Sequence, residues 1–137
     1  MKTVRTDRHP TPDEDRAARR VVLEVERTRV RLAGRFPPGT ACSSCGATHP
    51  AVLVAGSDPP ICYACSVPWS REGNHVAGHG RGPVVEMPAN EHRVFSEGER
   101  IGRWAMRGLD VPPETAFGLG LYTCLRLDRL GSLGGDL

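Results

Sequence analysis

Two Cys-x-x-Cys pairs lie in the first half of this 137-residue chain, with sixteen residues between Cys42/Cys45 and Cys62/Cys65. Four thiolates in two such pairs can surround a Zn²⁺ ion tetrahedrally, and this spacing lies in the range typical of zinc sites. A zinc ion with four cysteine ligands has no open coordination position, so it stabilises a fold and does not activate water. The sequence therefore predicts a structural Zn²⁺ site, and any catalytic chemistry must involve other residues.

The competing interpretation of the four cysteines is a pair of disulfides, which would require an exported chain. However, the N-terminus lacks the apolar run of a secretory signal, and no stretch approaches the length of a membrane span. These observations favour a cytoplasmic protein with reduced thiols and no membrane partner. The fifth cysteine, Cys124, shares a helical face with Leu121 and Leu125, so we expect it to be packed in the core.

Histidines follow the second cysteine pair and raise the question of catalysis. Residues 74–78 read Asn-His-Val-Ala-Gly, a glycine-rich turn and a short apolar segment follow, and residues 90–93 read Asn-Glu-His-Arg at the start of an expected helix. This order resembles the HNH family of nucleases over about residues 42–97. The resemblance implies a ββα unit stabilised by zinc-bound cysteine pairs, with metal-dependent hydrolysis of nucleic-acid phosphodiester bonds as its activity.

The resemblance also assigns roles to individual residues. His75 would be the general base that accepts a proton from the attacking water, and Asn74 and His92 would bind Mg²⁺ or another divalent cation. Position 74 is Asn where the family normally has His or Asp, and an amide oxygen is a weaker ligand for a dication. The turn after His75 is also one residue shorter than the family pattern. Both an active endonuclease and a degenerate site without catalysis therefore remain open.

A long amphipathic helix is expected over residues 12–33, before the first cysteine pair. Thr11 suits the N-cap, Pro12 suits the first turn, and three carboxylates follow at the positive end of the helix dipole. Gly34 and the turn after it should end the helix. The expected apolar face consists of Ala18, Val21, Val22, Val25 and Leu32.

A second helix is expected from about residue 88 to about residue 107. Its inward face should consist of Val94, Ile101 and Ala105, with Phe95 and Trp104 beside them. Four arginines recur at helical spacing along another stripe: Arg93, Arg100, Arg103 and Arg107. This stripe is either a solvated face or a surface that contacts nucleic-acid phosphates.

The expected fold is α+β, with a small zinc-bound treble-clef or ββα-metal-like core flanked by N- and C-terminal α-helices. Three segments follow from the sequence: a basic N-terminal helical arm (1–40), a zinc-knuckle HNH-like domain (41–108), and a C-terminal apolar helix with a flexible tail (109–137). Aromatic residues make up only 5% of the chain, so the apolar core should be modest. Bound metal would supply stability that such a core lacks.

Charge limits the choice of partner only weakly. The formal net charge is +2, and four thiolates with one Zn²⁺ would bring it to about zero, although residues 1–35 hold ten Lys or Arg against six Asp or Glu. The resemblance favours nucleic acid, with DNA as the preferred form, and a phage or mobile-element setting. The alternatives are a noncatalytic nucleic-acid-binding zinc module and a protein-interaction adaptor. In the adaptor, the apolar segment 117–130 would mediate assembly, including assembly with a second copy of the chain.

Overall fold

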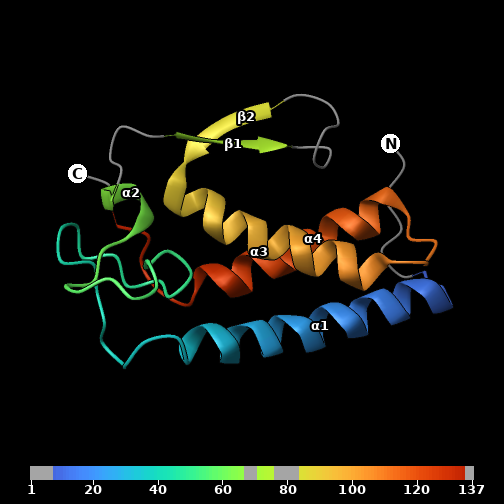
Figure 1. Ribbon diagram of the computed structural model, residues 1–137. Helices are drawn as coiled ribbons and strands as arrows, with labels where there is room; N and C mark the ends of the chain where they lie inside the picture. The colour runs from blue at the N-terminus through green and yellow to red at the C-terminus, as the bar shows by residue number, and fades with distance from the viewer. Residues whose placement is uncertain (1–7, 67–70, 76–83, 135–137) are drawn as a thin grey trace, which may run out of the picture.

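The computed structural model describes residues 8–66, 71–75 and 84–134 of the chain (Figure 1). Within these ranges it contains four α-helices and one two-stranded antiparallel sheet. The expected combination of helices with a short sheet is therefore confirmed. In chain order the elements are α1 (Pro12–Ala33), α2 (Tyr63–Ser66), β1 (Arg71–His75), β2 (Val84–Pro88), α3 (Ala89–Met106) and α4 (Pro113–Asp128).

Helix α1 begins and ends where the sequence predicts. The Thr11 hydroxyl accepts a hydrogen bond from the Glu14 N–H group at 3.1 Å, and the Thr11 N–H group donates to the Glu14 carboxylate at 3.0 Å. This capping box fixes the first turn, and Gly34 caps the C-terminus. The buried face was predicted partly wrongly: Ala17 is fully buried, whereas Val22 is 52% exposed. Neighbouring helices cover a face turned slightly away from the one that apolar spacing alone indicates.

Helices α1, α3 and α4 pack against one another around a shared apolar core. Figure 1 shows α3 between α1 and the β-hairpin, and α4 beside α3. The prediction that Val94, Ile101 and Ala105 face inward is confirmed, since all three are buried. Phe95 and Trp104 were placed beside them, but they are 40% and 39% exposed. Each stands at the border of the buried stripe, where no neighbouring helix covers the whole ring.

The loop that carries the cysteines is folded back on the helices. Leu53 and Cys62 form an isolated antiparallel bridge, the Val54 N–H group donates to Ile61 at 2.9 Å, and the Tyr63 N–H group donates to Val52 at 2.9 Å. These bonds form a short hairpin between the two cysteine pairs. Six residues of this loop join the core formed by the helices: Cys42, Ala47, Ala51, Val52, Leu53 and Cys62.

The β-hairpin leads directly into α3. Strand β1 pairs with β2 so that Asn74 lies opposite Val85 and His75 opposite Val84. Pro88 ends β2 and occupies the N-cap position of α3, and α3 contacts both strands. The backbone therefore follows a β–β–α order directly after the cysteine loop.

Helix α4 is linked to the N-terminus of α1 through Glu14. The Glu14 side chain is buried, accepts two hydrogen bonds from Arg8 at 2.8 and 2.9 Å, and accepts another from the Thr115 hydroxyl. These bonds hold the pKa of Glu14 well below its usual range, the Arg8 bond contributing most.

In the described part of the chain, no helix combines the length and apolar content needed to cross a lipid bilayer.

Candidate metal centre

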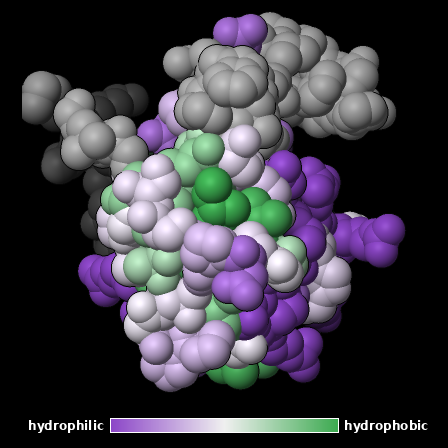
Figure 2. All heavy atoms as spheres, turned by 60° about the vertical axis from the view of Figure 1, so that its left-hand side comes forward, coloured by the Kyte–Doolittle hydropathy of each residue, from purple (hydrophilic) through white to green (hydrophobic). Residues whose placement is uncertain are grey.

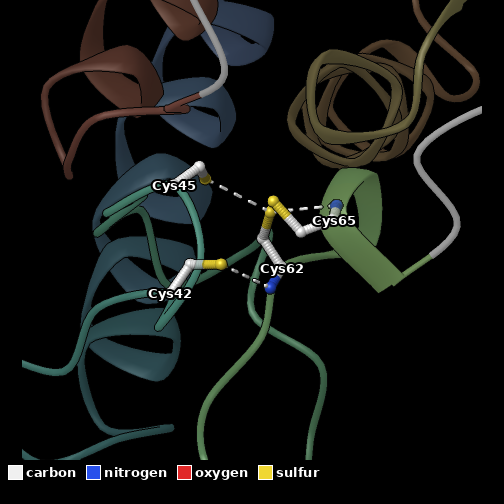
Figure 3. Close-up of side chains that lie close together, drawn as sticks. All are labelled: Cys42, Cys45, Cys62 and Cys65. Atoms are coloured by element: carbon white, nitrogen blue, oxygen red, sulfur yellow. Dashed lines mark hydrogen bonds between the residues drawn. The ribbon is translucent and has the colours of Figure 1, made fainter.

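The four predicted ligands meet at one place (Figure 3). One sulfur from each of Cys42, Cys45, Cys62 and Cys65 lies within 4.8 Å of the others, and the Cys45 and Cys62 sulfurs are 3.6 Å apart. In a tetrahedral zinc site with Zn–S distances of about 2.3 Å, neighbouring sulfurs are about 3.8 Å apart. All four cysteines are free thiols, so the disulfide interpretation has no counterpart in this structure. The cluster could therefore hold a structural metal ion such as Zn²⁺.

Tight local turns present the thiols. Gly46 has a φ of +81°, which permits the chain to turn back so that the Gly46 N–H group donates to the Cys42 carbonyl at 2.9 Å. In the second pair, the Cys65 N–H group points at the Cys62 sulfur at 3.4 Å. The Cys62 N–H group in turn points at the Cys42 sulfur at 3.3 Å, which joins the two pairs. Backbone donors aimed at sulfur stabilise thiolates, the form that binds zinc.

The thiols of the cluster differ in acidity. Burial alone would raise the pKa of Cys42, but backbone N–H groups, including those of Cys45 and Cys62, lower it to about 6. Burial, together with the adjacent Cys62 and Cys45 thiols, raises the pKa of Cys65 to about 12. Four thiolates at this separation repel one another, so they do not all ionise near neutral pH without a cation. A divalent cation removes that repulsion and displaces the remaining protons.

The C-terminal segment 131–134 covers one side of the cluster. The Thr48 and His49 N–H groups donate to the Ser132 carbonyl at 2.9 and 3.0 Å, and the Ser132 N–H group donates to the Thr48 hydroxyl at 2.9 Å. Gly134 has a φ of +65°, and a Cβ atom there would lie 2.6 Å from the Cys45 sulfur. The apolar C-terminal helix is expected to end in a flexible tail, but residues 131–134 of that tail are hydrogen-bonded to the first cysteine turn. Residues 135–137 of that tail lie outside the described ranges.

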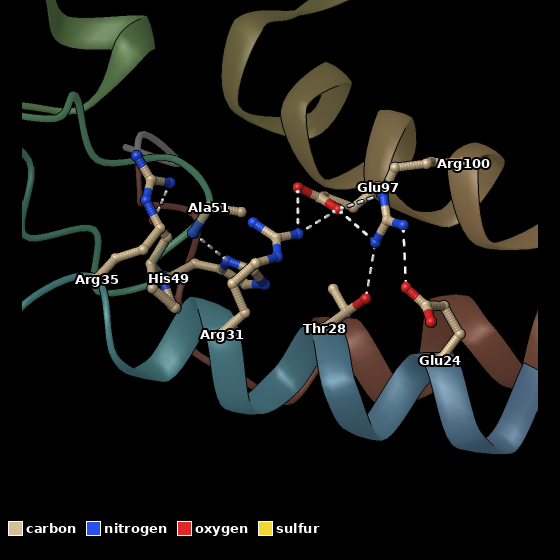
Figure 4. A network of polar contacts seen from close by, with 9 residues as sticks. Glu24, Thr28, Arg31, Arg35, His49, Ala51, Glu97 and Arg100 are labelled. Carbon is tan, nitrogen blue, oxygen red and sulfur yellow. Dashed lines mark hydrogen bonds and ion pairs between the residues drawn. The ribbon is translucent and has the colours of Figure 1, made fainter.

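His49 is a buried residue that sequence reasoning missed. Its Nδ1 atom accepts a hydrogen bond from the Ala51 N–H group at 3.1 Å (Figure 4), and its Nε2–H group donates to the Leu127 carbonyl at 2.8 Å. These two partners define a neutral imidazole with the proton on Nε2. Burial lowers the pKa of His49, against the opposing effects of the Leu127 carbonyl and Asp128. The side chain thereby joins the cysteine loop to the end of α4.

Asn90 joins the second cysteine pair to α3. Its side chain is buried, its Oδ1 atom accepts a hydrogen bond from the Ala64 N–H group at 3.0 Å, and its Nδ2 group donates to the Leu133 carbonyl at 2.9 Å. One amide thus connects α2, α3 and the C-terminal segment. From the sequence, Asn90 is only part of a helix-start motif, because its hydrogen-bond partners lie far away along the chain.

The proposed catalytic residues lie on the hairpin and the helix after it. His75 is the last residue of β1, Asn74 precedes it, and His92 is in the first turn of α3, where it is half-buried. The glycine-rich turn after His75 lies outside the described residues, as do the side chains of Asn74 and His75. The backbone therefore places these positions on adjoining elements, and their roles stay predictions.

The four arginines of α3 differ in their surroundings. The Arg93 guanidinium lies over the Tyr63 ring at 4.0 Å. Arg100 donates to Glu24 on α1 at 3.1 Å, to the Thr28 hydroxyl at 2.8 Å, and to Glu97 at 3.3 Å (Figure 4). Arg100 therefore holds α3 against α1. The two remaining members of the stripe, Arg103 and Arg107, are exposed.

Figure 2 shows the molecule turned so that the end with the cysteine loop comes forward. Hydrophobic residues gather near the middle of this face, and hydrophilic residues gather along one flank. The face is therefore mixed in character rather than uniformly hydrophilic.

Comparison of the chain with protein-family models, curated proteins and solved structures finds no match.

Proposed function

We propose that this chain is a zinc-stabilised, HNH-like protein that acts on nucleic acid. The observation that supports the proposal is the order of its parts: a four-cysteine cluster, then the antiparallel β1–β2 hairpin, then α3 directly after it. This is the order that the HNH resemblance implies for a treble-clef or ββα-metal core. It puts His75 at the end of the first strand and His92 in the first turn of the helix packed on that hairpin.

The cysteine cluster and the proposed reaction have separate tasks. Zinc held by four thiolates has no position for water, so hydrolysis of a phosphodiester would need a second cation. Asn74 and His92 would hold that cation, which would offset charge on the phosphate, and His75 would take the proton from water. An amide oxygen and an imidazole are only two ligands, and an imidazole suits transition metals better than Mg²⁺. We therefore expect Mn²⁺ to support more activity than Mg²⁺.

A second candidate is a noncatalytic module that binds nucleic acid, and Asn90 favours it. In this structure the amide of Asn90 is bonded to Ala64 and to Leu133, so this member of the helix-start motif stabilises the fold. Exposed Arg103 and Arg107 would then contact phosphates, and binding would weaken as salt is raised. The neutral Asn74 also fits loss of a catalytic cation.

A plasmid-nicking assay distinguishes the two candidates. Zinc-loaded protein is incubated with supercoiled DNA in the presence of Mg²⁺, of Mn²⁺, or of neither, and binding to a labelled duplex is followed in parallel by fluorescence anisotropy. Omitting the divalent ion is preferable to adding EDTA alone, because EDTA can also remove the structural zinc. The variants are His75→Ala, Asn74→Asp, and His9→Ala as a matched control, since His9 is exposed on the segment before α1.

Each result supports or overturns a candidate. Nicking that needs the divalent ion, disappears in His75→Ala and persists in His9→Ala supports the nuclease, and Asn74→Asp should then increase it. Salt-sensitive binding without nicking supports the noncatalytic module. A zinc-loaded chain that neither binds nor nicks DNA or RNA overturns both candidates.

A further inference from the structure

The outer face of α4 is apolar and exposed. Phe117 is 69% exposed, Leu121 49%, Leu125 60% and Tyr122 36%. Glu114 and Asp128 stand near the two ends of this fully described helix, and every exposed residue between them is uncharged. A helix that only faced water would carry charged side chains on this stripe, as α1 does. The α4 stripe is therefore better suited to contact with another surface than to solvent.

A groove runs beside this stripe, between α3 and α4. Its volume is about 580 Å³, and Glu99 is the one charged residue among those that line it. Three of the residues that line the groove are glycines, whose missing side chains leave space between the helices: Gly98, Gly102 and Gly120. Two lining residues, Phe117 and Leu121, also belong to the exposed stripe. A projecting apolar ridge and a glycine-floored groove thus lie side by side on one face.

We infer that this face binds a second copy of the same chain. A two-fold dimer brings the same patch of both subunits together, so the patch must complement itself. Here the ridge around Phe117 and Leu121 on one copy would enter the groove between α3 and α4 on the other, and the reverse contact would form by symmetry. The centre of the patch is uncharged, so pairing two copies brings no like charges together there.

Charges at the border of the groove fit the same arrangement. Glu99 lines the groove, and Arg103 follows one turn later on α3, where it is exposed. When two copies of α3 cross with opposite directions, Glu99 of one copy meets Arg103 of the other. In this arrangement a second copy supplies both charges, whereas a partner with a different sequence would need its own matching charges. This inference rests on neither the cysteine cluster nor the proposed nuclease residues, and it assigns Arg103 to the dimer contact rather than to phosphate.

Sedimentation equilibrium of the zinc-loaded, full-length chain tests the inference. We expect reversible dimers at micromolar concentrations, and about a tenfold or greater rise in the dissociation constant for Leu121→Glu and for Gly120→Leu. A Cβ atom at Gly120 meets nothing within 4 Å, and leucine favours a helix more than glycine does, so Gly120→Leu fills the groove without damaging the monomer. The control is Val30→Glu, which adds a charge to an apolar α1 residue that is 64% exposed.

Cys124 offers a second measurement in the same molecules, because it lines the groove. Its alkylation by a bulky maleimide should slow as protein concentration rises, and this slowing should vanish in Leu121→Glu. The inference is overturned if the wild-type chain stays monomeric up to its solubility limit. This holds even if the groove of that monomer binds some other apolar molecule. It is equally overturned by a dimer that Leu121→Glu leaves intact, or by one that Val30→Glu disrupts to the same extent.

Discussion

His49 contributes to the pH dependence of the stability of the protein. Both ring nitrogens are bonded in the folded chain, and burial lowers the pKa of His49 below its ordinary value of about 6.5. As pH falls below about 6.5, the unfolded chain takes up a proton before the folded chain does, so the free energy of unfolding decreases. The decrease continues until the pH reaches the pKa of the folded chain. We therefore expect denaturant unfolding to show lower stability at pH 5.5 than at pH 7.

The control for this prediction is His49→Gln, which keeps all four cysteines. Acid also protonates zinc-bound thiolates, and that loss is common to wild type and variant. The wild type should therefore lose more stability than His49→Gln between the two pH values, although the variant is less stable at pH 7. Equal losses in both proteins would show that His49 is not the group that titrates.

Gly134 controls how closely the C-terminal segment approaches the metal ligands. In Gly134→Ala the new Cβ atom would lie 2.6 Å from the Cys45 sulfur, so the segment must move away from the cluster. Residues that surround metal ligands commonly change metal affinity by about 10- to 100-fold when altered. We expect zinc transfer to a chromogenic chelator to be at least about tenfold faster in Gly134→Ala than in wild type.

Gly39→Ala is the matched control for this variant. Gly39 also has a positive φ, of +84°, so alanine is strained there too, but a Cβ atom at that position meets nothing within 4 Å. Both variants should therefore lose a similar amount of backbone stability, of about 1 kcal/mol. Zinc release should accelerate only in Gly134→Ala, and equal acceleration in both would assign the effect to strain in general.

At the scale of helices, Arg100 connects α3 to α1 while Arg103 does not share that role. Arg100 bonds Glu24 and Thr28 across the helix interface, and its side chain is 41% exposed. Arg100→Ala should lower the free energy of unfolding by about 1 kcal/mol, because a partly exposed ion pair and a hydrogen bond are both lost. Arg103→Ala should change it by less than about 0.5 kcal/mol. Urea unfolding at low salt measures both values, and similar losses would contradict the assignment.

The ends of the long helices were predictable because they depend on neighbours in sequence. Thr11 and Glu14 form a cap within one turn, and Gly34 ends α1 where it was expected. The faces of the helices were harder, because burial depends on where other helices pack. Val22 and Phe95 fit an apolar periodicity, yet the structure leaves 52% of Val22 and 40% of Phe95 exposed.

The grouping of the four cysteines was predictable from their spacing, but the side chains that hold the cysteine loop in place were not. Asn90 reaches Leu133 across 43 positions of sequence, and His49 reaches Leu127 across 78. No local pattern marks such pairs. The one available signal was the pair of glycines in the C-terminal segment. Gly131 packs against the backbone of His49, where a Cβ atom would lie 2.7 Å away.

For the whole molecule, the cysteine cluster and the helices form one packed unit rather than two. Ala47 and Leu53 of the cysteine loop share a core with Ile101 of α3 and Leu127 of α4. The segment 131–134 adds hydrogen bonds from the C-terminus to the first cysteine turn. Loss of a bound metal should therefore also destabilise α1, α3 and α4, which contain none of the four cysteines.

Zinc removal tests whether the cysteine loop and the helices unfold as one unit. We expect heating to give one transition, with helix loss followed by circular dichroism coinciding with zinc release. Cys62→Ser should lower the midpoint by more than about 10 °C, since each 1 kcal/mol shifts it by roughly 3–5 °C and a structural zinc contributes several kcal/mol. Cys124→Ser is the control, because Cys124 lies outside the cluster, and it should keep its zinc and nearly the wild-type midpoint. If zinc-free protein kept the helical transition at its original temperature, the loop and the helices would be separate folding units. The shared core of Leu53, Ile101 and Leu127 argues for the single transition.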